Sequence, residues 1–314
     1  MIAVVIPCYR VKDSILSVLA EIGPEVSQIY VVDDYCPEKS GAWVQTHCRD
    51  PRVIVHHNER NLGVGGATLT GFSLALQGGA DIVVKLDGDG QMDPSQISRL
   101  VRPIQEQRAD YAKGNRFYTP RSLKKMPFLR VIGNSALSFM TKISSGYWRI
   151  MDPTNGFVAL HTRVLSLLPV EKIEQRYFFE SDMLFRLNTI RARVIDVPMP
   201  VRYGDEKSSL RIGAILIPFA LKHLWRTLKR FGYGYFVRDF NIASVEIVGS
   251  ILFLTVGTAY GLHYWSYYGS RNQFTPTGTI MVSALLVILG FQLLLSAISF
   301  DIMNEPSDPI HPLL

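Results

Sequence analysis

The chain has 314 residues, which is long enough for one large domain with an appendage or for two small domains. Its three cysteines, Cys8, Cys36 and Cys48, are odd in number and lack a C-x-x-C spacing, so the sequence favours neither a disulfide framework nor a zinc site. The formal net charge is +6, and residues 202–238 hold eight basic residues against two acidic ones just before an apolar segment. That position favours lipid headgroups over nucleic acid as the anionic partner.

Buried strands and helices alternate through the first part of the chain. Residues 1–7 form an apolar run of strand length without a basic leader, so we expect no signal peptide. Strands are predicted over 3–6, 28–32, 52–56 and 80–86, with helices over about 13–22, 39–48 and 67–76. Because the strands are continuous apolar runs, we predict an α/β, Rossmann-like domain with a mostly parallel sheet that is covered on both faces. Ligands of such sheets bind at the carboxyl ends of the strands.

The most informative stretch is KLDGDGQMDP, residues 85–94, which follows a buried strand. In an extended segment the side chains of Asp87, Asp89 and Gln91 point the same way. Two carboxylates and an amide oxygen suit a hard divalent cation, Mg²⁺ or Mn²⁺. Such a cation can hold a diphosphate and neutralise the charge that develops as it departs. A solvated acidic turn is the alternative interpretation.

Two more polar clusters follow strands at the same predicted edge, Pro7-Cys8-Tyr9 and Asp33-Asp34. The carboxylates of Asp33 and Asp34 can accept hydrogen bonds from a nucleobase imide or a ribose hydroxyl, and a capping turn is the alternative. The glycine-rich run 61–67 follows the third strand at a distance, so we interpret it as a tight turn near the nucleotide and not as a dinucleotide fingerprint.

The second half of the chain supplies candidates for binding phosphate and the acceptor. Arg116 follows a predicted strand at 110–112 and could hold a diphosphate, and Arg202 ends the last predicted strand. Residues 121–130 mix basic and apolar side chains, which suits an anionic headgroup on a hydrocarbon chain or an ordinary surface loop. Glu180 and Asp182 open a helix and could be a general base, a sugar ligand or favourable first-turn charges.

Two segments near the C-terminus, 242–264 and 277–300, are long and apolar enough to cross a bilayer, with a buried core helix as the alternative for the first. Residues 210–231 mix apolar and basic side chains at helical spacing, which predicts a helix in the membrane interface with its basic face toward the headgroups. A soluble amphipathic helix packed on the domain is the alternative. The basic flank before the first span predicts that the N-terminal domain lies in the cytoplasm. The start of the first span and the end of the second span would lie on the same side.

The sequence thus predicts four regions: a cytoplasmic catalytic domain over 1–205, a basic juxtamembrane segment over 206–240, two transmembrane helices within 241–300 and a short acidic cytoplasmic tail over 301–314.

These residues together resemble the family 2 glycosyltransferases with the GT-A fold. Within that family the chain is most similar to the membrane-anchored polyprenyl-phosphate glycosyltransferases of the dolichol-phosphate mannose synthase type. The resemblance covers nearly the whole chain. It rests on residues 5–9, 31–34, 61–63, 86–91 and 152–157 together with the two C-terminal apolar segments.

The resemblance implies a role for each matching residue. Asp87, Asp89 and Gln91 would bind the cation with the diphosphate of a sugar nucleotide. The nucleotide would be lined by Pro7, Tyr9, Asp33, Asp34, Asp87 and Gly88, and the donor and lipid phosphates would be held by Arg116, Arg130 and Arg202. We count Asp89, Glu180 and Asp182 as catalytic candidates and Asn134, Asn155 and Gly156 as contacts of the acceptor or the sugar.

We therefore expect an inverting, metal-dependent glycosyltransferase that moves a sugar from a nucleoside diphosphate to undecaprenyl or dolichyl phosphate at the cytoplasmic membrane face. Its partners would be the donor, the lipid acceptor and membrane lipids, with no nucleic acid, and a homo-oligomer remains open. One alternative is transfer to a saccharide or lipid-linked hydroxyl with Asp182 as base, because a phosphate acceptor is already anionic and needs none. A non-catalytic nucleotide-binding membrane protein and an NAD-dependent enzyme are the alternatives from other classes.

Overall fold

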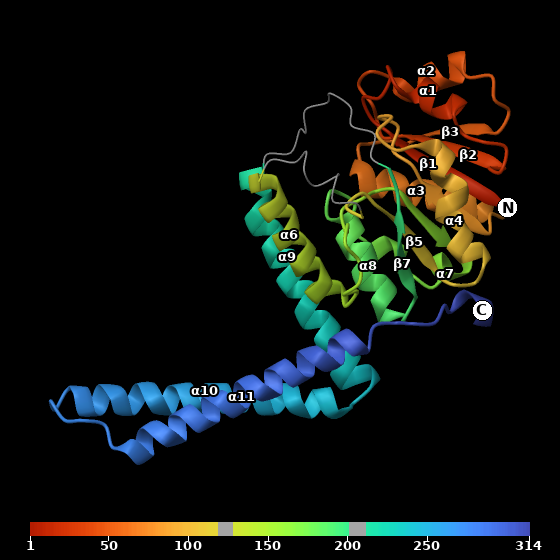
Figure 1. The fold of residues 1–314 in the computed structure, drawn as a ribbon. Helices are drawn as coiled ribbons and strands as arrows, with labels where there is room; N and C mark the ends of the chain where they lie inside the picture. Colours follow the sequence, from red (N-terminus) through yellow and green to blue (C-terminus); the bar gives the residue numbers. More distant parts are fainter. Residues whose placement is uncertain (119–127, 201–211) are drawn as a thin grey trace. The chain divides into compact units, whose positions relative to one another are not determined.

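The computed structural model describes residues 1–118, 128–200 and 212–314, and it confirms the predicted α/β class (Figure 1). The chain divides into two compact units. One unit comprises residues 1–228 together with 306–314, and the other comprises residues 229–305.

The first unit is built on a seven-stranded sheet in the order β3-β2-β1-β4-β6-β5-β7. Its strands are β1 (Ile2–Cys8), β2 (Gln28–Asp33), β3 (Val53–His57), β4 (Ile82–Lys85), β5 (Tyr111–Asn115), β6 (Val158–His161) and β7 (Val194–Pro198). Strand β6 runs antiparallel to its neighbours β4 and β5, and the other pairings are parallel. The predicted mostly parallel sheet is therefore confirmed.

Helices cover both faces of this sheet, which explains why its strands are continuous apolar runs. Along β1, Ala3 and Val5 enter one buried cluster, whereas Val4 and Ile6 enter the other. The first cluster is completed by α3, α7 and α8, and the second by α1, α2 and α4 (Figure 1). The helices are α1 (Ile15–Ala20), α2 (Ser40–His47), α3 (Gly63–Gln77), α4 (Ile97–Gln105), α6 (Phe128–Ser145), α7 (Thr162–Ser166), α8 (Phe179–Thr189) and α9 (Ile212–Gly232).

The chain turns immediately after β4, so the prediction of an extended segment over 87–91 is wrong. Gly90 adopts a φ of +79°, a left-handed conformation that favours glycine. Gly88 is buried, and its carbonyl accepts a 2.7 Å hydrogen bond from the Ser14 hydroxyl. This contact holds the turn against the first helix, and the alternation of side chains is lost.

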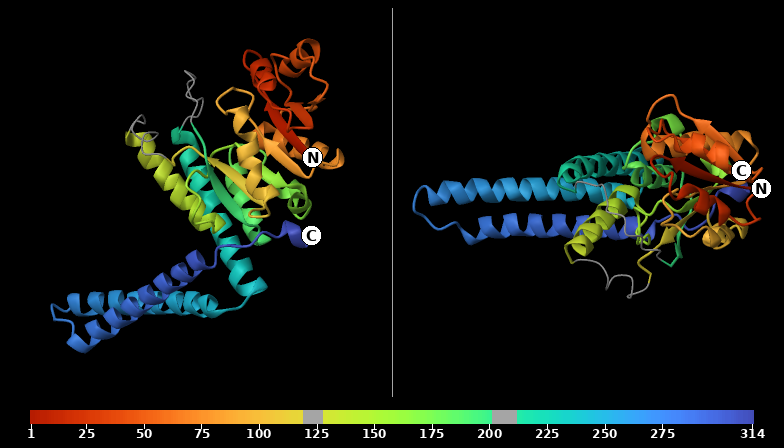
Figure 2. Two further views of the ribbon diagram at one scale, coloured as in Figure 1. Left: turned by 45° about the vertical axis from the view of Figure 1, so that its right-hand side comes forward. Right: turned by 90° about the horizontal axis from the view of Figure 1, so that it is seen from above.

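The second unit contains the two long apolar helices, α10 (Ile242–Gly269, 28 residues) and α11 (Thr277–Met303, 27 residues). Each exceeds the roughly 20 residues that cross a bilayer, and they run side by side in the views of Figure 2. A Cβ on Gly257 or Gly290 would come within 2.8 Å of a leucine of the other helix. Small residues therefore allow close contact between the two helices.

Two polar contacts hold the second unit together: one joins α10 to α11, and the other joins the end of α9 to the end of α11. Glu246 of α10 accepts a 2.7 Å hydrogen bond from the Ser296 hydroxyl of α11. Arg230 forms a buried two-pronged ion pair with Asp301 at 2.6 and 2.9 Å, and the hydroxyl of Tyr235 donates to the same carboxylate. Asp301 thus belongs to α11, two residues before that helix ends, although the sequence placed it in the tail.

The last residues, 306–314, belong to the compact unit of the sheet and end in a short helical turn, η4 (His311–Leu313). The Asp110 carboxylate, at the start of β5, accepts hydrogen bonds from the backbone amides of Ile310 and His311. The C-terminal segment is therefore docked on the domain that precedes the apolar helices.

Candidate active site

The turn after β4 places two carboxylates at the carboxyl end of a central strand. Asp87 is half-buried, and one of its oxygens accepts a 2.7 Å hydrogen bond from the ammonium of Lys85. Asp89 is also half-buried, and its Oδ1 accepts the backbone amide of Gln91 at 3.0 Å. The Gln91 side chain itself is exposed.

Lys85 connects this turn to helix α8, a role that the sequence reasoning missed. Its side chain is 1% exposed, and its Nζ lies 3.6 Å from Oε1 of Glu180 in addition to its bond with Asp87. Burial, the largest effect, lowers the pKa of Lys85, but Asp87 and Glu180 outweigh it and the pKa is raised overall. The ammonium therefore holds one carboxylate from each side of the site.

A second buried lysine, Lys113, lies across β6 from the first. Both lysines pair in register with Val158, Lys85 from β4 and Lys113 from β5. Lys113 donates to the carbonyl of Asn155, and burial lowers its pKa to about 8. The sequence did offer a signal for both lysines, because each stands inside a buried strand. An ammonium is buried only where partners compensate its charge, so partners could have been expected.

Gly156 lies next to the side chains of Lys85 and Asp87. A Cβ at this position would overlap Nζ of Lys85 and come within 3.0 Å of Oδ2 of Asp87. The structure thus brings Asp87, Glu180 and Gly156 together around Lys85.

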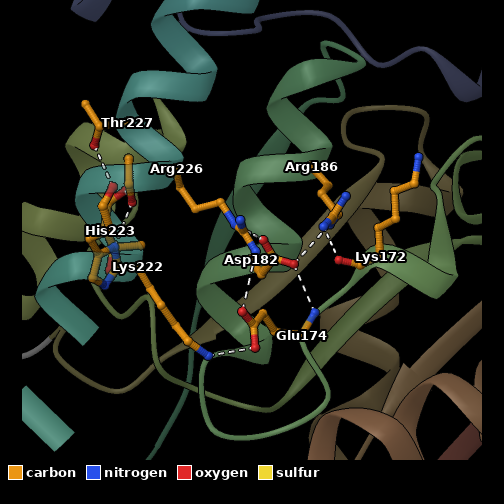
Figure 3. A network of polar contacts seen from close by, with 10 residues as sticks. Lys172, Glu174, Asp182, Arg186, Lys222, His223, Arg226 and Thr227 are labelled. Carbon is orange, nitrogen blue, oxygen red and sulfur yellow. Dashed lines mark hydrogen bonds and ion pairs between the residues drawn. The ribbon is translucent and has the colours of Figure 1, made fainter. Parts of the chain in front are cut away.

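Asp182 lies in a different environment from Glu180, although both open α8. Its side chain has no exposed surface, and both of its oxygens are engaged. Oδ1 accepts from Nε of Arg226 at 2.5 Å, and Oδ2 accepts from Nε of Arg186 and the amide of Glu174, each at 3.0 Å (Figure 3). Asp182 therefore joins elements of the fold and offers no surface to a substrate.

Two basic residues of α9 form ion pairs with the loop before α8. Lys222 and Arg226 pair with Glu174, at 2.7 and 3.5 Å (Figure 3). Contact of the basic face with headgroups stays a prediction. The exposed large apolar side chains of the helix are Ile217, Leu221, Leu224, Trp225 and Leu228, and Lys229 is exposed beside them.

Asp33 and Asp34 are both buried and both bind backbone amides. Asp33 accepts from Cys36 and Gly41, each at 2.7 Å, and so holds the start of α2. Asp34 accepts from Leu62 at 2.8 Å and from Gly63 at 2.7 Å, and so holds the start of α3. This is the capping arrangement that the sequence left as an alternative; contact with a nucleotide stays a prediction.

The loop after β1 contains the other two nucleotide candidates. Pro7 is half-buried within the strand, whereas the Tyr9 side chain is exposed. Arg10 has a φ of +57°, and its amide donates to the Cys36 sulfur at 3.1 Å. This hydrogen bond joins the loop after β1 to the loop after β2, next to the exposed ring of Tyr9.

Arg116 is held by a carboxylate that the sequence reasoning did not single out. Asp152 is fully buried and accepts from Nε of Arg116 at 2.7 Å and from its Nη2 at 3.0 Å. The side chain of the arginine remains 39% exposed. Asn155 is buried and donates to the carbonyl of Gly114 at 2.7 Å.

Three other candidates remain, Asn134, Arg130 and Arg202. Asn134 lies half-buried on α6. Arg130 belongs to the same helix, but its side chain lies outside the described residues, as does the whole of Arg202.

Among the residues that the structure describes, no cluster of three or more His, Cys, Asp or Glu side chains is placed to hold a metal. The pair Asp87 and Asp89 nevertheless fits a hard divalent cation, because both carboxylates are partly exposed and come from one short turn. With one Asp87 oxygen bound to Lys85, the other faces Gly156.

Comparisons with known proteins define the class. The family model described as glycosyl transferase family 2 matches residues 3–168. Solved structures of the same fold include glucosyl-3-phosphoglycerate synthase from Mycobacterium tuberculosis with Mn²⁺ and UDP, at a TM-score of 0.55 and 19% identity over 74% of this chain and 80% of that one. The GT-A-like fold and the identification as an enzyme are thus confirmed.

The chain belongs to glycosyl transferase family 2. It is 34% identical to the UDP-N-acetylglucosamine–dolichyl-phosphate N-acetylglucosaminyltransferase of Methanococcus voltae, over 57% of this chain and 70% of the relative. It is 32% identical to the undecaprenyl-phosphate mannosyltransferase of Micrococcus luteus, over 65% of this chain and 86% of the relative. These relatives are of the predicted polyprenyl-phosphate type.

Proposed function

We propose that this enzyme transfers a sugar from a nucleoside diphosphate sugar to a polyprenyl phosphate at a membrane surface. The observation that carries the choice of acceptor is the burial of Asp182 between Arg186 and Arg226. A hydroxyl acceptor needs a base that reaches it, whereas a phosphate is already anionic at neutral pH. With Asp182 engaged, the site favours the phosphate, and the two apolar helices suit its lipid chain.

The donor would bind at the carboxyl ends of β1, β2 and β4. Asp87 and Asp89, with Gln91, would hold Mg²⁺ or Mn²⁺, which when bound neutralises charge on the departing diphosphate. The hydrogen bond from the Lys85 ammonium fixes the rotamer of Asp87. Tyr9 would contact the base, whereas Asp33 and Asp34 act by fixing the loops around it.

The phosphates would be bound by arginines. Asp152 orients the Arg116 guanidinium through two hydrogen bonds, and this partly exposed arginine would bind a phosphate of the donor or the lipid. Arg130 and Arg202 are proposed for the same task on sequence grounds alone. Glu180, next to Lys85, would contact the transferred sugar.

We further propose that α10 and α11 cross the membrane as a hairpin with both ends in the cytoplasm. Residues 306–314 belong to the same unit as the catalytic domain, which supports one side of the membrane for both ends of the hairpin. The basic excess before α10 favours the cytoplasm as that side. The exposed apolar side of α9 would then enter the lipid interface.

The test is to incubate the purified, full-length protein with polyprenyl phosphate, Mn²⁺ and a panel of sugar nucleotides, and to identify the lipid product by mass. We expect one glycosyl polyprenyl phosphate, and its loss in Asp89→Ala or with a chelator. Transfer only to a saccharide or lipid-linked hydroxyl would overturn the acceptor assignment. Nucleotide binding without turnover of any donor would overturn the proposed function as a whole.

A further inference from the structure

Helix α8 begins at the centre of the candidate site and is fixed there by a neighbouring helix. Its first turn carries Glu180, whose Oε1 lies 3.6 Å from the ammonium of Lys85. Two residues further along, about half a turn, Asp182 faces away from the site toward α9. The same short segment thus contains a group that faces the reacting centre and a group that anchors the helix.

The anchor on α9 is one face of that helix, formed by Phe219, Lys222, His223 and Arg226. Arg226 binds Asp182 at 2.5 Å through Nε and approaches Glu174 at 3.5 Å through Nη2 (Figure 3). The rings of Phe219 and His223 pack edge-on against Phe178, which immediately precedes α8.

Asp182 has two arginine partners with different consequences. Arg186 lies one turn along the same helix, with a side chain that is 11% exposed; it binds Asp182 within α8 and also donates to the carbonyl of Lys172 before that helix. Arg226 has a matched exposure of 12%, but it comes from α9 and joins α8 to that helix. Their effects on the position of α8 must therefore differ if the connection to α9 matters.

We propose that Arg226 is a positioning residue for the acceptor end of the site: through Asp182 it sets the first turn of α8 and with it Glu180. Asp182 is a buried charge, so loss of its partner from α9 favours a shift of the helix toward other donors. The inference rests on the proposed function only in naming this end as the acceptor end. The donor groups on β1, β2 and β4 have hydrogen-bonded anchors of their own, and Arg226 takes no part in those bonds.

The experiment compares Arg226→Met with Arg186→Met in the full-length protein in detergent. Hydrogen exchange of the peptide covering residues 178–185 reports the position of α8 without any substrate. We expect at least tenfold faster exchange in Arg226→Met and less than threefold in Arg186→Met. Equal effects in the two variants, or none in Arg226→Met, would overturn the proposal.

Kinetics then separate positioning from general loss of structure. In Arg226→Met we expect the kcat of transfer to polyprenyl phosphate to fall at least tenfold, while the Kd for nucleoside diphosphate with Mn²⁺ changes less than twofold. Arg226→Lys, which keeps the charge without the guanidinium fork, should recover part of the kcat. A parallel loss of nucleotide affinity would contradict the proposal. If the unmodified enzyme transfers nothing to polyprenyl phosphate, the proposed function fails, and the exchange comparison still decides the role of Arg226.

Discussion

His311 donates a 2.8 Å hydrogen bond from Nδ1 to Oδ1 of Asp110, a residue 201 positions earlier in the chain. The same buried carboxylate accepts the backbone amides of Ile310 at 2.9 Å, of His311 at 2.8 Å and of Arg193 at 2.8 Å. One carboxylate therefore anchors the C-terminal segment and the turn before β7 together.

Replacement of Asp110 by Ala should destabilise the catalytic unit by about 3 kcal/mol, because several buried donors lose their acceptor at once. The measurement is thermal unfolding of the full-length protein in detergent. Glu106→Ala is the matched control, since Glu106 forms an exposed ion pair with Arg108 and should contribute about 0.5 kcal/mol or less. Equal melting temperatures for the two variants would show that the C-terminal segment is not held as described.

His223 makes the packing of α6 against α9 sensitive to pH. Its Nδ1 bonds the Ser144 hydroxyl at 2.8 Å, its side chain is buried, and burial lowers its pKa to about 4. Between pH 6.5 and 4 the unfolded chain therefore binds a proton that the folded protein does not, so stability is complete above 6.5 and falls as the pH drops. At pH 5 the loss should be about 2 kcal/mol.

The variant that tests this is His223→Gln, which can still bond Ser144 but does not titrate. Its melting temperature should change less between pH 7.5 and pH 5 than that of the unmodified protein. A residual change is expected from His161, because burial, its neighbour His311 and Arg163 lower its pKa to about 4 as well. An identical pH dependence in both proteins would exclude His223 as a source.

Local chemistry made the fold and the position of the site predictable. A continuous apolar run such as Val4-Val5-Ile6 is stable only when helices cover both faces of the sheet, and this requirement is visible in the sequence. The Asp87-Gly88-Asp89 turn then follows from its place after such a strand. Its shape did not follow, because Ser14, 74 residues away, bonds Gly88 and bends it.

The partners of the charged residues could not be predicted for the same reason. Lys85 and Lys113 approach each other only because β4 and β5 both pair with β6, a register set by the whole sheet. Asp182 resembles a catalytic base in sequence, yet Arg226, 44 residues later, binds it. Which buried charges meet is a property of the tertiary structure, whereas the need for some partner could be inferred from burial alone.

Asp34 offers a direct test of structural against nucleotide-binding roles. Asp34→Ala leaves the buried amides of Leu62 and Gly63 without their acceptor, so we expect the protein without nucleotide to lose about 3 kcal/mol of stability. Tyr9→Ala is the contrast: its ring is exposed, so unfolding without nucleotide should hardly change, whereas the stabilisation by added nucleoside diphosphate should shrink. If Asp34→Ala unfolds at the unmodified temperature, Asp34 does not support the loop.

Gly156 should tolerate no side chain, because the space its Cβ would need is filled by Nζ of Lys85 and bordered by Asp87 at 3.0 Å. In Gly156→Ala the ammonium must move, and Asp87 loses the contact that fixes its rotamer. A displacement of this kind should lower metal-dependent transfer about 100-fold, measured as kcat/KM at saturating Mn²⁺. Gly278→Ala, at the start of α11, serves as control because a Cβ there meets nothing within 4 Å and activity should be retained. If Gly156→Ala transfers sugar at the unmodified rate, then Lys85 and Asp87 do not set the geometry of the donor site, and the cation must be held by other groups.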